Sequence, residues 1–225
     1  MQAIDVHSEL KKKDNVTLLS DASFFNLLGA SRVCVNKRIF YVWIWVLKRQ
    51  GVILTKVGLF YGTDTGNTET IAHKIQKILG AEVVMLHDVH DAKVSDFEKY
   101  DKIILGQPTW YCGELQSTWE DFWPEFKKVD FSGKQVAFFG LGDQLEYGEF
   151  FVDAMGLMHD VVLDNGGEPV GYFPNEGFMF EESKALTDDG DFFVGVVIDE
   201  DQQPERTDQR LQFWIEQIRE EMDLL

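Results

Sequence analysis

The feature that most constrains this chain is a regular alternation of short apolar runs and amphipathic stretches that begins near residue 56. Such alternation is typical of βα units, in which helices join parallel strands and cover the sheet. We expect strands at 56–61, 81–86, 102–106, 135–140 and 169–173, and another short one at 192–198. We expect helices at 68–79, through 119–126, at 149–165, and at the C-terminal end with Thr207 or Asp208 as cap. The pattern predicts an α/β fold, a doubly wound five-stranded parallel sheet whose fifth strand is interrupted by an insertion at 175–191.

Charge is divided unevenly along the sequence. The 225 residues include 21 basic and 39 acidic ones, a net charge of −18. Residues 1–55 hold eight basic and four acidic residues, whereas residues 56–225 hold 13 basic and 35 acidic ones, a balance of −22. The shift predicts a boundary near Thr55 between an N-terminal extension, 1–55, and a single domain, 56–225. So acidic a domain argues against nucleic acid or an anionic membrane as partner and favours basic proteins.

The extension at residues 1–55 does not suggest a fold. Its apolar run, Ile39–Leu47, has nine residues, and crossing a bilayer needs about 20. The run lies too far from the start for a secretory signal, and the composition matches a transit peptide weakly. A processed targeting segment, a tail and an over-extended gene start are the interpretations left open. Because two cysteines supply no disulfide framework, we expect the cytoplasm, or the plastid stroma if this segment is a transit peptide.

A phosphate cradle is predicted after the first expected strand. Open parallel sheets bind ligands outside the carboxyl ends of their strands, at a switch point in strand order. The loop at this place, 63–68 (TDTGNT), combines three hydroxyls, a glycine and the free N–H groups of a helix start. It has no lysine and no GxxxxGK[ST] spacing, which argues against a nucleoside triphosphate with Mg²⁺. A well-capped turn is the plainer alternative for this loop.

Aromatic rings follow the third and fourth expected strands. The loop 108–115 (PTWYCGEL) carries Trp110, and the loop 140–148 (GLGDQLEYG) carries Tyr147 together with glycines that permit close backbone approach. Exposing such rings is costly unless they cover something flat, although Trp110 folded back onto the core is the alternative. Two rings beside a phosphate cradle predict a slot for a planar ring with a phosphate tail, which is the shape of flavin mononucleotide (FMN).

The sequence resembles the long-chain flavodoxin family over about residues 56–225. Three motifs occur in order, TxTGxT, PTWxxGELQS and FGxGDQxxY, and DGDFFVGVVIDEDQQPERTD is similar to the segment that follows the inserted loop in that family. The resemblance implies the flavodoxin strand order 2-1-3-4-5 with non-covalently bound FMN at the switch point.

The resemblance also implies which residues meet the flavin. The phosphate would be held by the first loop, namely Thr63, Asp64, Thr65, Gly66, Asn67 and Thr68. Trp110 and Tyr147 would cover opposite faces of the isoalloxazine. The ring edges would meet the backbones of residues 109–113 and 141–147, which include Thr109, Tyr111, Cys112, Gly113, Leu141 and Gly142. Asp143 and Asp201 match acidic positions near the flavin and its ribityl chain.

The chain departs from the family pattern inside these loops. Tyr111 stands where Asn or Gly is common, and those residues adopt a positive φ at lower cost, so rotation of the Tyr111–Cys112 peptide is expected to be harder. Leu141 and Phe150 replace residues that are usually polar, which predicts weaker FMN binding. Cys112 is interpreted as a small apolar filler. No metal site is expected from the spacing of the five histidines.

The function implied by the resemblance is a low-potential one-electron carrier that shuttles electrons in place of ferredoxin and has no substrate of its own. The negative domain would disfavour the charge that a flavin gains on reduction. The expected partners are basic-faced redox proteins such as ferredoxin–NADP reductase or photosystem I, docked transiently by a monomer. An FMN-dependent NAD(P)H:quinone reductase is the alternative, but no basic cluster lies near the three loops in the sequence. A phosphorylated regulatory domain of the same topology would leave both rings unexplained.

Overall fold

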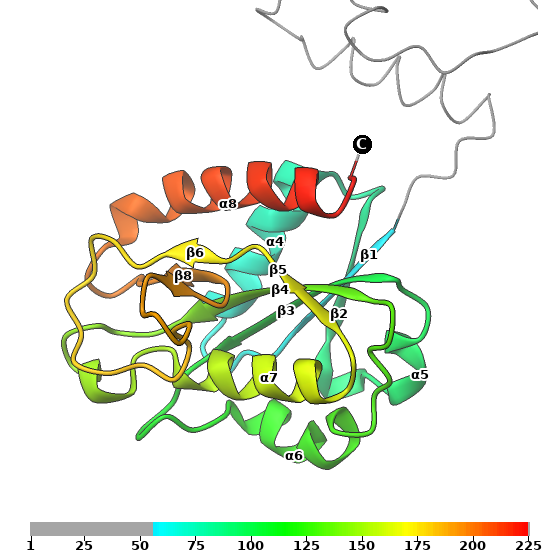
Figure 1. Cartoon of the computed structure of the whole chain (residues 1–225), viewed down its shortest axis with the longest axis horizontal. Coiled ribbons are helices and arrows are strands. Elements are labelled where there is room, and N and C mark those ends of the chain that lie inside the picture. The colour runs from blue at the N-terminus through cyan, green and yellow to red at the C-terminus, as the bar shows by residue number, and fades with distance from the viewer. Residues whose placement is uncertain (1–55, 225) are drawn as a thin grey trace, which may run out of the picture. The chain divides into compact units, whose positions relative to one another are not determined.

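A parallel sheet with strand order β2-β1-β3-β4-β5 forms the centre of the computed structural model, which describes residues 56–224 (Figure 1). The predicted extension and its boundary near Thr55 lie outside the described residues. The strands of the sheet are β1 (Val57–Tyr61), β2 (Val84–Asp88), β3 (Lys102–Pro108), β4 (Gln135–Leu141), β5 (Glu168–Val170) and β8 (Val196–Ile198). Every pairing among them is parallel, which confirms the predicted fold class and strand order.

The outer edge of β4 is shared by two short strands. β5 pairs with the first half of β4, with Gln135 opposite Glu168, and β8 pairs with its second half, with Leu141 opposite Ile198. The fifth strand of the sheet is therefore interrupted, as predicted, and its second part returns from a distant point in the sequence. Because β8 ends beside the end of β4, the segment after Ile198 begins at the same edge of the sheet as the loops that follow β1, β3 and β4.

Three of the predicted strands differ from the structure by a division or by a shift of three residues. The apolar stretches 169–173 and 192–198 each divide, because Phe173–Pro174 (β6) and Phe192–Phe193 (β7) pair with each other in a separate antiparallel sheet. Gly171, at φ 77°, turns the chain away from β4, and Gly195 brings it back to within 2.3 Å of the Phe138 oxygen, measured from the position that a Cβ would occupy. β2 begins three residues later than predicted, because residues 81–83 form the turn after α4.

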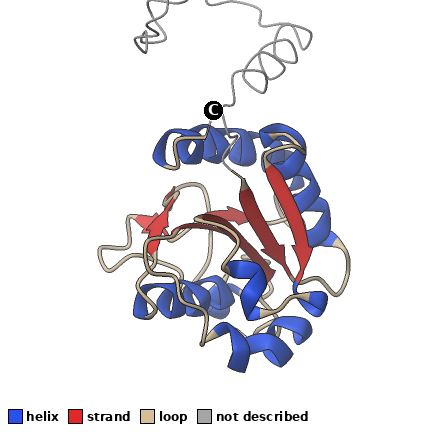
Figure 2. Ribbon diagram, turned by 90° about the vertical axis from the view of Figure 1, so that its right-hand side faces the viewer, coloured by secondary structure: helices blue, strands red, loops and turns tan. Residues whose placement is uncertain are grey.

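Helices cover both faces of the sheet (Figures 1 and 2). Their bounds are α4 (Asn67–Leu79), α5 (Val94–Phe97), α6 (Ser117–Phe126), α7 (Asp153–Asp164) and α8 (Thr207–Glu221). Short 3₁₀ turns lie at Val89–Asp91, Gly148–Phe150 and Pro204–Arg206. α4 and α8 pack together on one face, and α7 packs against β3, β4 and β5 on the other. None of the helices within residues 56–224 is long and apolar enough to cross a membrane.

Two predicted helix starts are corrected. α7 begins at Asp153 and not at Glu149, because residues 148–150 form a 3₁₀ turn and Val152 takes a left-handed conformation with φ 53°. In α8 neither predicted cap acts as one: Arg206 holds the cap position, Thr207 donates its hydroxyl to Glu200, and Asp208 pairs with Lys74. The apolar residues of this segment are buried, namely Leu211, Trp214, Ile215, Ile218 and Met222.

Candidate functional site

The first loop forms a turn that leaves backbone N–H groups free at the start of α4. Gly66 caps the helix at φ 88°, and its own N–H donates to Thr63 Oγ1 over 3.0 Å. The next three N–H groups, from Asn67 to Glu69, have no intrahelical acceptor because the first turn of a helix offers none. A Cβ at Gly66 would meet no atom within 4 Å, so the space above the turn is open. These features fit a phosphate group, which a helix N-terminus stabilises without a lysine.

Asp64 has a different place from the one that its position in the motif suggests. Its carboxylate turns toward α6, where Oδ1 accepts hydrogen bonds from Gln116 Nε2 at 2.9 Å and Ser117 Oγ at 2.7 Å. Gln116 is buried, and its Oε1 accepts the N–H of Trp119 at 3.2 Å. The Asp64 side chain thus fastens the first loop to the start of α6, which directly follows the second loop.

The second loop closes in a tight hairpin turn. Trp110 and Glu114 exchange backbone hydrogen bonds of 3.0 and 2.7 Å around Tyr111, Cys112 and Gly113. Tyr111 has φ 44° and Gly113 has φ 85°, so a tyrosine occupies a conformation that favours glycine or asparagine. Tyr111 is 67% exposed, and the ring of half-buried Trp110 lies 6.1 Å from the Tyr111 ring, measured between ring centroids. The turn presents aromatic surface and backbone groups at the end of β3.

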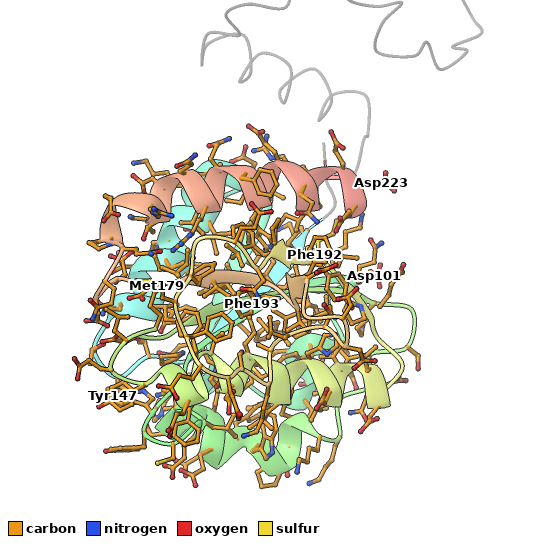
Figure 3. The ribbon with its side chains drawn as sticks, turned by 60° about the vertical axis from the view of Figure 1, so that its left-hand side comes forward. Asp101, Tyr147, Met179, Phe192, Phe193 and Asp223 are labelled. Carbon is orange, nitrogen blue, oxygen red and sulfur yellow. The ribbon has the colours of Figure 1, made fainter. Side chains whose placement is uncertain are left out.

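The third loop is joined to the second by its backbone. Thr109 N donates to the Leu141 oxygen over 2.9 Å, and Gly142 N donates to the Ile198 oxygen over 3.2 Å. The Leu141 side chain is buried, so it is not presented at the surface of this loop. Tyr147 is 54% exposed and lies at the edge of the molecule (Figure 3). An exposed phenol ring of this kind has a face available for stacking on a planar ligand.

The acidic residues of the third loop are organised by hydrogen bonds. Asp143 Oδ1 accepts the N–H groups of Leu145 and Glu146 at 2.9 and 3.0 Å, and Gln202 Nε2 donates to both of its carboxylate oxygens. Asp201 is exposed, and its pKa is raised by partial burial first and then by the negative charges of Asp143, Asp199 and Glu200. The two predicted acidic positions therefore lie in one negative region beside the loop.

Sequence reasoning missed a buried carboxylate at the centre of this region. Asp199 is fully buried and accepts four hydrogen bonds, two from Gln144 on Oδ2 and two from the N–H groups of Asp201 and Gln202 on Oδ1. Gln144 in turn accepts the N–H of Met179 at 2.6 Å. Gln116 and Gln144 both stand inside the recognised motifs, so a signal existed for these two, whereas nothing in the run VVIDED distinguishes Asp199 from Asp201.

The structure brings the predicted site residues together at the carboxyl ends of β1, β3 and β4. The first loop is tied through Asp64 to the start of α6, which follows the second loop directly. The second loop is tied to the third through Thr109, and the third to the segment of Asp201 through Asp199. Within residues 56–224, no three His, Cys, Asp or Glu side chains are grouped so that they could hold a metal ion. An open helix N-terminus, aromatic rings on the loops and a negative rim on a doubly wound sheet are the features of an electron-transfer flavoprotein.

Comparison with known proteins agrees with this class. The model of the family "Flavodoxin" matches residues 59–214, and the chain belongs to the flavodoxin family. "Flavodoxin 1" of Escherichia coli K12 is 51% identical over 167 residues, which cover 74% of this chain and 94% of that protein. The flavodoxin of Synechocystis is 49% identical over 167 residues, 74% of this chain and 97% of that protein.

A solved structure gives the same result. The crystal structure of Fusobacterium nucleatum flavodoxin bound to flavin mononucleotide has a TM-score of 0.70 and 32% identity, and the match covers 74% of this chain and 98% of that one. Family membership confirms two predictions made from the sequence, an FMN cofactor and an electron carrier in place of a quinone reductase. The roles of individual site residues stay predictions.

Proposed function

We propose that this protein is a low-potential one-electron carrier that substitutes for ferredoxin between redox proteins. The observation that carries the proposal is that the three loops meet at one edge of the sheet, where the Thr109–Leu141 bond joins the second loop to the third and the Asp64–Ser117 bond joins the first loop to the start of α6. Bound FMN supplies the redox centre, and the chain supplies the environment that sets its potential. Flavodoxins transfer electrons to redox partners in general, and the choice of partner is part of the proposal.

We assign the predicted residues to FMN as follows. The N–H groups and hydroxyls of the first loop, residues 63–68, bind the phosphate. Trp110 and Tyr147 stack on the two faces of the ring system, and the backbones of 109–113 and 141–147 line its edges. The Asp143 and Asp201 carboxylates lie near the ring and ribityl chain, where their charge opposes the gain of an electron.

The excess negative charge directs the carrier to basic partners. Residues 56–225 carry 13 basic and 35 acidic side chains, so a basic reductase or photosystem surface attracts this domain over several ångströms and releases it as salt rises. The measurement is the rate of electron transfer to ferredoxin–NADP reductase between about 10 and 300 mM salt, a range over which screening changes strongly. A rate that does not change with salt contradicts electrostatic docking.

A monomer in the cytoplasm is the form in which we expect the carrier to act. The relatives named above are bacterial, and the comparisons offer no support for the plastid alternative. Sedimentation of the full chain tests the monomer, and cell fractionation tests the compartment.

The visible spectrum of the purified chain during stepwise reduction tests the carrier function itself. The expected result is a yellow protein that takes up electrons one at a time and oxidises NADPH negligibly without a reductase. A colourless protein that does not bind added FMN would overturn the proposal, and rapid NADPH oxidation by the protein alone would favour the reductase.

A further inference from the structure

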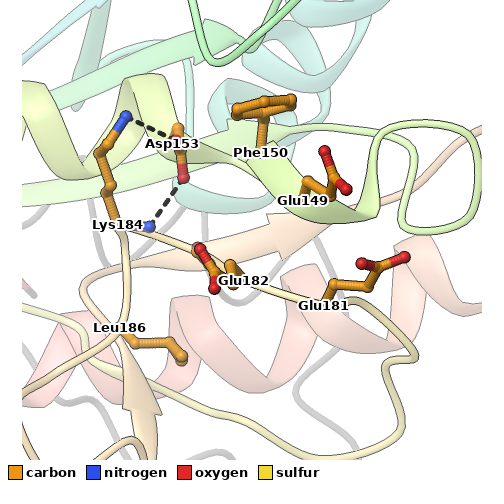
Figure 4. A pocket seen from close by; sticks show the side chains of 8 residues that line it. Glu149, Phe150, Asp153, Glu181, Glu182, Lys184 and Leu186 are labelled. Atoms are coloured by element: carbon orange, nitrogen blue, oxygen red, sulfur yellow. Dashed lines mark hydrogen bonds and ion pairs between the residues drawn. The ribbon is translucent and has the colours of Figure 1, made fainter.

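A buried carboxylate links the insertion to the start of α7. Asp153, the first residue of α7, is 2% exposed, and its Oδ1 accepts a hydrogen bond of 2.7 Å from the Lys184 N–H. Its Oδ2 lies 2.9 Å from Lys184 Nζ, whose side chain is 59% exposed (Figure 4). The pair stands beside a groove of about 420 Å³ between residues 149–153 and 181–186. The pair thus joins one buried charge to one that solvent reaches.

The same carboxylate packs against the second flavin loop. A Cβ at Gly113 would lie 2.8 Å from Asp153 Oδ2, so only a glycine lets the turn approach the carboxylate this closely. Gly113 is the last residue of the Tyr111-Cys112-Gly113 turn. The neighbouring Ala154 N–H donates to Thr109 Oγ1 over 3.2 Å, which fixes the beginning of the same loop. The start of α7 therefore supports the second loop at both of its ends.

Lys184 is held in place by backbone packing as well as by its charge. A Cβ at Gly156 would lie 2.3 Å from the Lys184 carbonyl oxygen, so the insertion rests directly on α7 at that glycine. Glu181 and Glu182 donate their N–H groups to the Gly148 oxygen at 2.9 and 3.0 Å. These main-chain contacts fix the backbone of the insertion so that the Lys184 ammonium group lies at the Asp153 carboxylate.

We propose that Asp153 and Lys184 are positioning residues for the flavin. Asp153 supports the 111–113 turn, and Lys184 balances the carboxylate charge that this support places next to the flavin edge. The inference rests on the proposed function, in which residues 109–113 line the ring. Because reduction adds negative charge to the flavin, an unbalanced carboxylate here opposes reduction, and a balanced one does so less. The insertion thus sets the reduction potential through one lysine.

The charge test compares two single variants and their combination. Lys184→Met leaves the carboxylate unbalanced and shifts the two-electron potential to more negative values, whereas Asp153→Asn shifts it to more positive values. We expect each to change the ratio of the affinities for oxidised and reduced FMN about tenfold, which is about 30 mV for a two-electron couple. The double variant loses both charges. We expect its potential to return toward the wild-type value, with a remaining shift of at most about one third of either single-variant shift. Equal signs for the two single variants would overturn the charge role, since loosening of the loop moves both in one direction.

The support role has its own readout in FMN binding to the apoprotein. Asp153→Ala removes the support, and we expect the dissociation constant for oxidised FMN to rise about tenfold, or about 1.4 kcal/mol. Asp153→Asn keeps an oxygen for the Lys184 N–H and retains the affinity of the wild type. Thermal unfolding of each apoprotein shows whether the variant is folded. Equal affinity in Asp153→Ala and wild type would overturn the support role.

Asp96 and Lys99 provide a matched control pair. Asp96 likewise accepts a backbone N–H, from Lys93 at 2.8 Å, and a lysine ammonium, from Lys99 at 2.6 Å, but it lies at the opposite end of the sheet, before β3. Asp96→Asn and Lys99→Met alter the net charge equally and should leave the potential unchanged. Shifts as large as those at Asp153 and Lys184 would overturn the inference. Failure of wild-type apoprotein to bind FMN would instead refute the proposed function.

Discussion

Gln144 and Asp199 are joined by two hydrogen bonds, one from the Gln144 backbone N–H at 3.1 Å and one from its side-chain amide at 2.7 Å, both to Asp199 Oδ2. Gln144 lies in the third loop, and Asp199 directly follows β8, 55 residues further along the chain. A buried carboxylate is costly unless donors satisfy it, and here four donors do. The bond therefore locks the loop that carries Tyr147 to the segment that carries Asp201.

Removal of the Gln144 side chain should lower the stability of the fold. Gln144→Ala deprives buried Asp199 of one donor and leaves the Met179 N–H without its acceptor, so we expect a loss of about 2 kcal/mol in the free energy of unfolding. Urea denaturation of the apoprotein measures it. The control is Gln202→Ala, because exposed Gln202 keeps its backbone bond to Asp199 and should cost less than about 1 kcal/mol. Equal losses in the two variants would contradict the role given to Gln144.

A second prediction separates backbone strain from phosphate binding in the first loop. Gly66 and Gly133 both have positive φ, 88° and 74°, and a Cβ at either would meet nothing within 4 Å. Alanine at each position should cost about 1 kcal/mol of stability from the left-handed conformation alone. Only Gly66→Ala should also weaken FMN binding, because it disturbs the turn that presents the N–H groups. Isothermal titration of both apoproteins with FMN checks this, and equal affinities would remove Gly66 from the cradle.

The sequence predicted the layered fold well because local periodicity determines it. Each apolar run from Val57 to Leu141 became a strand in the expected order. Strands inside a parallel sheet are buried on both faces and read as continuous apolar segments, whereas the edge strand β2 is only partly buried. The division of 169–173 and 192–198 was missed because it depends on contacts between distant residues. Gly171 turns the chain against Trp214 and Ile218, and Gly195 returns it against Phe138, and no local pattern reports such contacts.

The candidate site was predicted in outline and missed in its internal connections. The motifs located all three loops, but they did not show that the Asp64 carboxylate turns away from the cradle to Gln116 and Ser117. Asp201 was predicted because it matches an acidic position of the family, and nothing in the run VVIDED distinguishes it from Asp199. Burial distinguishes Asp199 from Asp201. This burial depends on how β8 pairs with β4, and the apolar sequence of a strand that is covered on both faces does not show that pairing.

Tyr111 tests how much strain the second loop stores. At φ 44° a β-branched residue is a genuine outlier, whereas Asn tolerates the conformation, so Tyr111→Val should lower the free energy of unfolding by about 1–2 kcal/mol relative to Tyr111→Asn. Both variants remove the same exposed ring, which makes them controls for each other. Chemical denaturation of the two apoproteins gives the difference. Equal stability would mean that the turn adopts another conformation in solution.

The raised pKa of Asp201 predicts a pH dependence of stability with a definite sign. Because the folded-state pKa lies above the usual aspartate value, the folded protein holds the proton more tightly than the unfolded chain does. Ionisation of Asp201 therefore lowers stability as the pH rises through the unfolded-state and folded-state pKa values, and the loss is complete above them. Asp201→Asn should consequently raise the melting temperature at pH 7 and leave it unchanged near pH 3, where the carboxyl is protonated in both states.

Asp130→Asn is the contrasting control. Hydrogen bonds from Ser132 lower the pKa of exposed Asp130, so that variant should lower the melting temperature at pH 7. Thermal unfolding at the two pH values gives these melting temperatures. A lower melting temperature for Asp201→Asn at pH 7 would contradict the prediction and show that charges other than those around Asp143 and Asp199 stabilise the ionised carboxylate.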